Sequence, residues 1–187
     1  MKKILTTSVF LLLLALLVQP IKSFAADTKS ASSLNYAVIN VVYVMSQSKA
    51  VQGITKQVNA YREKLEKQAK IKQDELQQNQ QDLVKKQSEM SPKDFEKAKQ
   101  QFQTKVQNVQ QEFYNKSQSL EKVREEALAT IEKSIGSILD KIAKENNNEI
   151  IFQATSLARY SKDKDISEAV VAQLNKNTPS VNVKKPF

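Results

Sequence analysis

Residues 83–102 have the sequence LVKKQSEMSPKDFEKAKQQF, and the apolar residues on the two sides of this segment are mirror images about Ser91-Pro92. In each mirrored pair the two residue numbers have the same sum. The pairs are Met90 with Phe95, Leu83 with Phe102, Leu76 with Val109, Leu65 with Leu120, Val58 with Ala127, and Ile54 with Ile131. A constant sum is the register of two antiparallel helices. The sequence therefore predicts a long helical hairpin over residues 51–145, with its tip near residues 90–93.

The tip of this hairpin has the pattern of a helix start. Ser91 suits the N-cap, Pro92 suits the first helical position, and Met90 can pack on Phe95 as a hydrophobic staple. The alternative is one continuous helix kinked at Pro92. It is disfavoured because the apolar repeat of seven that ends at Met90 would continue through Lys97.

The seam between the two helices is expected to change along its length. Near the base it is apolar, and the register pairs isoleucines and valines there. Farther out it is interrupted by polar residues, since Lys72 would face Phe113 and Ala69 would face Lys116. At 1.5 Å per residue the helices would be about 60 and 80 Å long, more than a compact domain of this size accommodates. The pattern predicts a firm base and a flexible outer part.

The segments that flank the hairpin are rich in β-branched residues. Strands are expected at residues 36–42 and 150–152, with a weaker one at 157–160, and a final helix capped by Asp165 should follow. Such short strands cannot form an independent core, so we expect residues 35–50 and 146–175, the body, to be completed by strands of other subunits. The residues expected in this oligomerisation body are Tyr36, Val38, Ile39, Val41, Ile150, Ile151 and Phe152.

The two ends of the chain differ from the rest in composition. Residues 1–25 begin with Lys2 and Lys3 and continue with an apolar run and Ser23-Phe24-Ala25, the pattern of a signal peptide cleaved near Ala25. A flexible leader is expected over residues 26–34, and a disordered tail is expected over residues 176–187. The sequence thus predicts an exported protein.

The chain is basic, and the surplus charge lies near the tip of the hairpin. The formal net charge is +9, and loss of the three lysines in residues 1–25 would leave +6. A solvated helical surface explains such charge, and so does a patch that attracts acidic polymers or anionic headgroups. The candidate binding residues, expected to act collectively, are Lys85, Lys86, Lys93, Lys97 and Lys99.

Residue types that carry most enzyme chemistry are missing. The sequence has no histidine and no cysteine, which removes the commonest general base, the thiol nucleophile and the usual zinc ligands. Asp163 and Asp165 lack the glycine turn and distal glutamate of a calcium loop. With only Gly53 and Gly136, no phosphate-binding glycine loop can form. We therefore expect no enzyme and no catalytic, cofactor or metal-binding residues.

The order of these elements resembles the Skp/OmpH periplasmic chaperones. The resemblance covers residues 35–175 and rests on the helical hairpin and on five short segments. These are Tyr36-Ala-Val-Ile-Asn-Val, Ser46-Gln47-Ser48-Lys49-Ala50, Ile150-Ile151-Phe152, Tyr160-Ser161 and Asp165-Ile166-Ser167. It implies an α+β fold in which a homotrimer builds a central β-body and three hairpins project around a cavity. It also implies a periplasmic protein that holds unfolded outer-membrane proteins without ATP, and contact with anionic lipid or lipopolysaccharide.

The leading hypothesis is therefore a holdase, a chaperone that binds unfolded outer-membrane proteins and prevents their aggregation. Basic, flexible arms suit such a task because they can attract a client electrostatically and shield it without tight packing. One alternative is a structural adaptor whose hairpin bridges envelope components. Nucleic-acid binding rests only on net charge, and the signal peptide argues against it.

Overall fold

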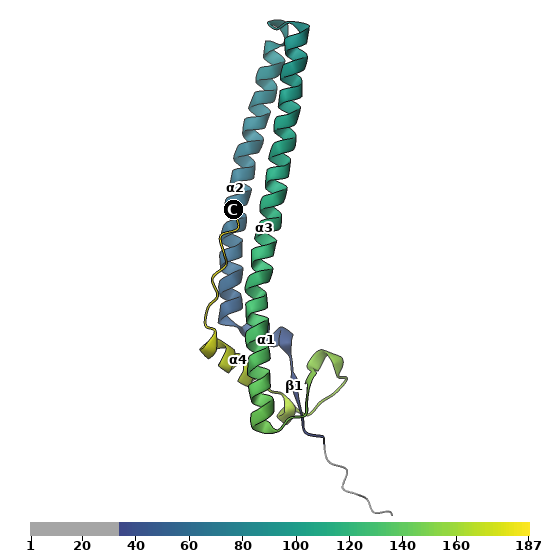
Figure 1. The fold of residues 1–187 in the computed structure, drawn as a ribbon, viewed down its shortest axis with the longest axis vertical. Coiled ribbons are helices and arrows are strands. Elements are labelled where there is room, and N and C mark those ends of the chain that lie inside the picture. The colour runs from purple at the N-terminus through teal and green to yellow at the C-terminus, as the bar shows by residue number, and fades with distance from the viewer. Residues whose placement is uncertain (1–33) are drawn as a thin grey trace, which may run out of the picture. The chain divides into compact units, whose positions relative to one another are not determined.

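The computed structural model describes residues 34–187, and the hairpin dominates this part of the chain (Figure 1). The predicted signal peptide and all of the predicted leader except Leu34 lie outside the described residues. The helices and strands are β1 (Tyr36–Ile39), α1 (Val41–Gln47), α2 (Lys49–Lys85), α3 (Pro92–Asn146), β2 (Ile150–Gln153) and α4 (Ser167–Asn177). Single turns of 3₁₀ helix lie at Lys86–Ser88, Ala154–Ser156 and Lys162–Lys164. Among the described residues, no helix is both long enough and apolar enough to cross a membrane.

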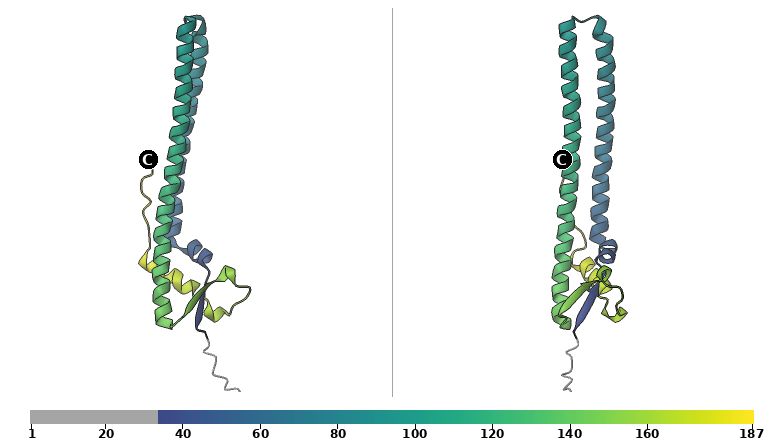
Figure 2. Two further views of the ribbon diagram at one scale, coloured as in Figure 1. Left: turned by 45° about the vertical axis from the view of Figure 1, so that its right-hand side comes forward. Right: turned by 90° about the vertical axis from the view of Figure 1, so that its right-hand side faces the viewer.

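Helices α2 and α3 run antiparallel, which confirms the predicted hairpin (Figures 1 and 2). The Ser91 hydroxyl accepts a hydrogen bond from the backbone N–H of Asp94 at 3.2 Å and donates one to the Asp94 carboxylate at 2.6 Å. Pro92 opens α3 as expected, and Met90 and Phe95 are both half-buried. The first helix ends at Lys85 and does not reach the tip predicted near residues 90–93, because a 3₁₀ turn at Lys86–Ser88 follows it.

The packing of the hairpin changes sharply along its length. In the root, residues 51–58 and 120–145, the seam is closed by fully buried side chains. These are Ile54, Val58, Leu120, Ala127, Ile131, Ile135, Ile138 and Ile142. In the distal arm, residues 59–119, no residue is fully buried, and the seam positions are half-buried. The polar interruptions at Lys72 and Lys116 occupy such half-buried positions, so the predicted contrast between base and outer part is present.

The body contains a two-stranded parallel sheet. Tyr36 pairs with Ile150 and Val38 with Phe152, and Val38 also bridges to Asp165 on its other side. The predicted first strand was too long, since β1 ends at Ile39. Asn40 then caps α1, because its side-chain oxygen accepts a hydrogen bond from the backbone N–H of Tyr43 at 3.0 Å. Val41 therefore opens a helix instead of extending the strand.

The segment after β2 also differs from its prediction. Residues 157–160 form no strand but a loop after a 3₁₀ turn. The final helix starts at Ser167, one residue later than a cap at Asp165 requires, yet the Asp165 carboxylate does accept the Ser167 backbone N–H at 2.9 Å. The inner face of α4 is as predicted, with Val170 and Leu174 fully buried.

The two ends of the hairpin are tied together at the base. α3 ends as predicted in the asparagine run, where Asn147 adopts the left-handed conformation (φ 52°) that asparagine tolerates at this position. The Asn35 side-chain amide donates to the backbone oxygens of Asn146 at 2.8 Å and Asn147 at 3.0 Å. Glu149 N–H donates to the Asn35 carbonyl at 2.7 Å. These bonds align β1 with β2.

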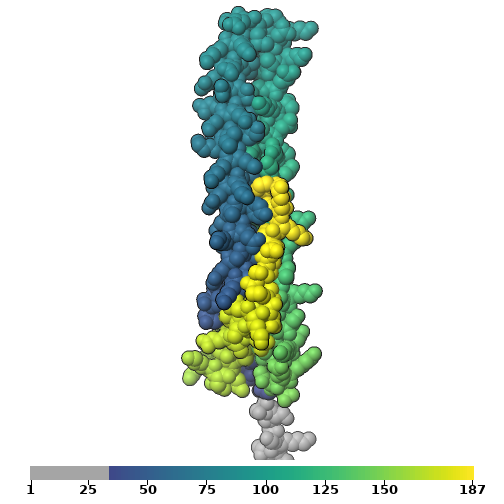
Figure 3. Space-filling view, turned by 90° about the vertical axis from the view of Figure 1, so that its left-hand side faces the viewer, coloured from purple at the N-terminus to yellow at the C-terminus, as the bar shows by residue number. Residues whose placement is uncertain are grey.

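Residues 178–187, the strap, differ from the disordered tail expected for this region. The strap runs in extended form along the hairpin, over the seam between α2 and α3 (Figure 3). Val183 is buried, and Val181 packs against the same core. Tertiary contacts order this segment, which has no helical or strand periodicity of its own.

Candidate functional site

One candidate surface is the edge of the sheet. Among the described residues, β1 has a neighbour on each side, β2 and the backbone at Asp165, whereas β2 pairs only with β1. One large exposed apolar side chain, Ile150, lies on β2 itself, and three others lie in or next to the body: Leu34, Val42 and Tyr43. An unpaired edge with exposed apolar residues is a surface that a further strand can cover.

The seven residues predicted for the oligomerisation body differ in position and in exposure. Six lie on the two paired strands, and Val41 does not, because it lies in α1. Val38 and Ile39 are buried inside the subunit, so they are core residues and unavailable to a partner. Tyr36 and Phe152 stack edge to face with ring centroids 5.8 Å apart, and both are half-buried, as is Ile151. Ile150 is 42% exposed.

Polar residues hold the body together on the side of β1 that faces away from β2. The buried Ser167 hydroxyl accepts the backbone N–H of Asn40 at 2.8 Å, and the Tyr160 hydroxyl donates to Asp165 at 3.0 Å. Partial burial opposes ionisation of Asp165, but hydrogen bonds from Ser167 and Tyr160 outweigh it and lower its pKa. Asp163, whose pKa is lowered by a hydrogen bond from Ser161, lies on the same loop. Both aspartates thus have structural partners.

The second candidate surface is the distal arm, where the predicted lysines lie. All five are exposed, and they lie on both sides of the tip: Lys85, Lys86, Lys93, Lys97 and Lys99. Lys99 pairs with Glu96 at 3.6 Å, a contact on the same helix that leaves both side chains largely in solvent. The structure brings these lysines to one end of the hairpin without enclosing them.

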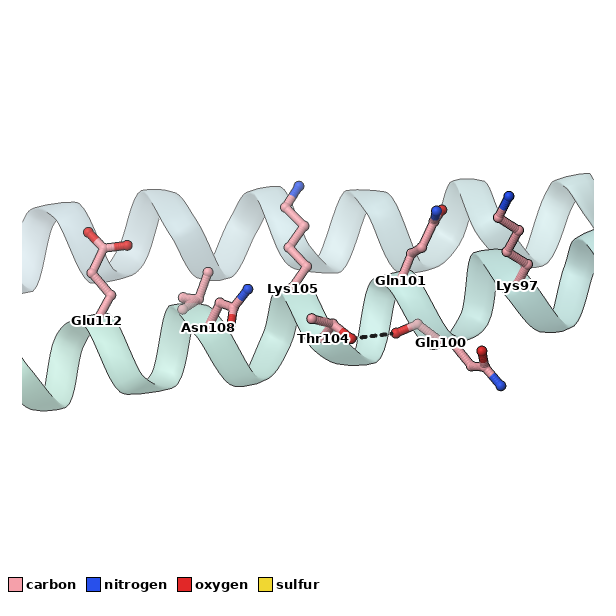
Figure 4. A pocket seen from close by; sticks show the side chains of 8 residues that line it. Lys97, Gln100, Gln101, Thr104, Lys105, Asn108 and Glu112 are labelled. Atoms are coloured by element: carbon pink, nitrogen blue, oxygen red, sulfur yellow. Dashed lines mark hydrogen bonds between the residues drawn. The ribbon is translucent and has the colours of Figure 1, made fainter.

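A shallow groove of about 540 Å³ runs along α3 below the tip. Figure 4 shows Lys97, Gln101 and Lys105 extending from one side of the helix. The Thr104 hydroxyl is turned back to the Gln100 carbonyl at 3.0 Å. The groove is lined by long flexible side chains that can donate or accept hydrogen bonds, so it suits many weak contacts more than one fixed ligand.

A third surface lies midway along the hairpin, where the strap ends. Phe187 packs edge to face on Tyr61 with ring centroids 6.3 Å apart, and the Lys116 ammonium lies 5.7 Å from the centre of the Phe187 ring. The recess around Phe187 measures about 520 Å³ and is also lined by Lys64 and Lys67. Sequence reasoning missed this surface, since nothing in the strap or in the repetitive helices indicates that they meet.

Comparison with known proteins gives one family match and one similar solved structure. Residues 35–174 match the family model described as outer membrane protein (OmpH-like). The crystal structure of a candidate outer membrane chaperone (OmpH-like) from Caulobacter crescentus CB15 has a TM-score of 0.73 with this chain at 12% sequence identity, covering 79% of this chain and 88% of that one. No sequence among the curated proteins matches. Because the family model spans well over half of the chain, this chain belongs to the OmpH-like family.

Proposed function

We propose that the protein is an ATP-independent holdase of the periplasm that binds unfolded outer-membrane proteins between basic helical arms. The OmpH-like fold supports this role, since the structural relative from Caulobacter crescentus is described as a candidate outer membrane chaperone. The observation that carries the proposal for this chain is the contrast between its closed root and its loosely packed distal arm.

The packing of the arm suits reversible binding of unfolded chains. Half-buried seam residues hold two helices together without a thick core, so the distal arm can bend while each helix stays intact. Its surface carries lysines and glutamines in place of an apolar cleft. Many weak polar and electrostatic contacts can attract a client and release it without nucleotide hydrolysis.

The cavity that the proposal requires would come from assembly. We propose a homotrimer in which the free edge of β2 pairs with a strand of a neighbouring subunit and the hairpins leave the body on the same side. The exposed Ile150 on β2 supports this arrangement, because a neighbouring strand would cover it. In solution, the mass of the chain from Ala26 onward should correspond to three copies.

The test of the holdase is dilution of a urea-unfolded outer-membrane protein into buffer with the assembled chaperone and no nucleotide. We expect a soluble complex, detected by light scattering and by co-elution. The proposal would be contradicted if the protein left aggregation unchanged. It would also be contradicted if the protein bound one stable folded partner and had no affinity for unfolded clients.

The electrostatic part has a matched control. Replacing Lys85, Lys86, Lys93, Lys97 and Lys99 by glutamine should weaken suppression of aggregation by about tenfold at low salt and by less at moderate salt. The control replaces five exposed lysines of the root and body, Lys49, Lys56, Lys133, Lys141 and Lys144, which removes the same charge. Equal loss in both variants would show that net charge matters and that the tip does not.

A further inference from the structure

The strap is held through its main chain by a single glutamine. The side-chain NH₂ of Gln57, on α2, donates to the Val181 carbonyl at 2.9 Å, and its side-chain oxygen accepts the Val183 backbone N–H at 3.0 Å. The amide thus bridges the backbone on the two sides of Asn182, as a neighbouring β-strand would. Because only main-chain groups take part, this contact does not depend on the sequence of the bound segment.

Two side-chain contacts of the strap are polar: Lys184 pairs with Glu126 at 2.8 Å, and the Thr178 hydroxyl donates a hydrogen bond to the Ser134 hydroxyl at 3.1 Å. Its apolar contacts are less specific. Val183 is buried, and its small β-branched side chain lies against the seam of the root. Farther on, the Phe187 ring rests on Tyr61 and beside Lys116. An extended segment with a β-branched residue and, four positions later, an aromatic ring would satisfy the same surface.

The positive charge of the recess disfavours one residue of the strap, Lys185. The recess is lined by Lys64, Lys67 and Lys116 of the hairpin, and the strap adds Lys185 to them. Lys116 is paired with Glu112 at 2.7 Å, but the site as a whole favours negative charge. A segment with a neutral or acidic residue in place of Lys185 should therefore bind this surface better than the strap does.

The strap covers a surface that extends along the hairpin from Gln57 to the recess around Phe187; we call it the strap groove, and it is separate from the groove below the tip. We propose that the strap groove is a binding site for an extended polypeptide segment with an aromatic side chain, and that the strap occupies it until a client segment displaces it. The source of that segment, an unfolded client, rests on the proposed function. The strap keeps the groove covered while no client is present, because its tether gives it an effective concentration of the order of millimolar.

The first test uses a fluorescent peptide with the sequence of residues 178–187 and an amidated end. Protein that lacks these residues should bind the peptide at least tenfold more tightly than the full chain does. In the shortened protein, Gln57→Ala should weaken binding at least tenfold, whereas Gln81→Ala, on the exposed outer surface of α2, should leave it unchanged. Equal binding to both proteins, or none to the shortened one, would overturn the proposal.

Peptide variants test the two side-chain preferences. Replacing Phe187 by alanine in the peptide should weaken binding, and replacing Lys185 by glutamate should strengthen it severalfold at low salt. A Lys185→Glu peptide that binds more weakly would contradict the charge argument. A Phe187→Ala peptide that binds as well as the parent would remove the aromatic requirement.

The second test uses the intact protein and is independent of any truncation. Hydrogen exchange of the strap amides, above all Val183, should accelerate at least tenfold when an unfolded outer-membrane protein is bound, while amides of the root stay protected. Unchanged protection of Val183 in a complex that holds its client would overturn the proposal and leave the holdase intact. If no client complex forms, the proposed holdase function is wrong. The peptide measurements then test by themselves whether the strap groove binds an extended segment.

Discussion

The root and the distal arm are built from the same two helices, yet they are packed to different degrees. In the root, side chains such as Ile54 and Ile131 are almost completely buried and belong to the core that also contains α4. In the distal arm, Ile71 is 58% exposed and Val84 is 61% exposed, and polar residues share the seam. The helices of the arm are therefore held together by partial burial of the seam, whereas full burial fixes the root to the body.

The largest expected effect comes from an exposed isoleucine outside the hairpin. Ile150→Asp at the free edge of β2 should break the proposed trimer into single chains, because a charge there opposes pairing with a further strand. Ile71→Asp, in the distal arm, makes the same change at an even more exposed isoleucine and should leave the oligomer intact. Light-scattering mass measurement separates the two, and an intact oligomer for Ile150→Asp would refute the proposed edge.

The next effect compares two isoleucines of the hairpin. Ile131→Ala in the root should lower the free energy of unfolding by about 2–5 kcal/mol, since it empties a fully buried site. Ile71→Ala in the distal arm should change it by no more than about 0.5 kcal/mol. Urea denaturation at fixed protein concentration measures both, and similar values would mean that the root and the arm are equally packed.

A smaller effect is expected at the tip. Ser91→Ala removes the N-cap of α3, a change that costs about 1 kcal/mol locally. We expect faster hydrogen exchange at Asp94 and Phe95, with the midpoint of global unfolding almost unchanged, because the distal arm can open by itself. Ser88→Ala, in the 3₁₀ turn before the tip, serves as the control and should have no such effect. A marked drop in global stability would instead couple the tip to the root.

The smallest effect concerns pH and the strap. Lys184 pairs with Glu126 at 2.8 Å, and this hydrogen bond, more than the Coulomb attraction of Lys184 and Lys122, lowers the pKa of Glu126 from its ordinary 4.5. A carboxylate whose pKa is lowered by docking favours docking above pH 4.5 and loses that contribution as the pH falls through the lowered pKa. Exchange at Lys184, corrected for its intrinsic rate, should rise modestly from pH 6 to pH 3. Glu126→Gln should abolish this dependence, and a pH response that persists in that variant would point to another group.

The hairpin could be predicted because its evidence is local and repeated. Ser91 and Pro92 indicate the turn, and the mirrored apolar residues indicate the register of the two helices. Several independent positions therefore predict the same hairpin. The β-branched run after β1 misled the prediction, since Val41 and Val42 favour a strand by composition. Asn40 decides otherwise by capping α1, a signal that was present in the sequence but weaker than the run that follows it.

The strap could not have been predicted in the same way. Its order depends on Gln57, which is one of many glutamines in the hairpin and has no distinguishing neighbours in the sequence. The contacts of Phe187 with Tyr61 and of Lys184 with Glu126 join positions more than 50 residues apart. No periodic pattern in the sequence indicates such pairings. The polar, aperiodic composition of the strap therefore led to the prediction of a disordered tail.

The parallel pairing of β1 with β2 has a consequence for the order in which the chain folds. The two strands are separated by the entire hairpin, so their ends meet only after a loop of about one hundred residues has closed, which is slow for a flexible chain. A hairpin that starts at Ser91 and zips toward its base shortens that search step by step and delivers Asn35 next to Asn147. We therefore expect helix formation to come first and the sheet last, with subunits joining only when the base is complete.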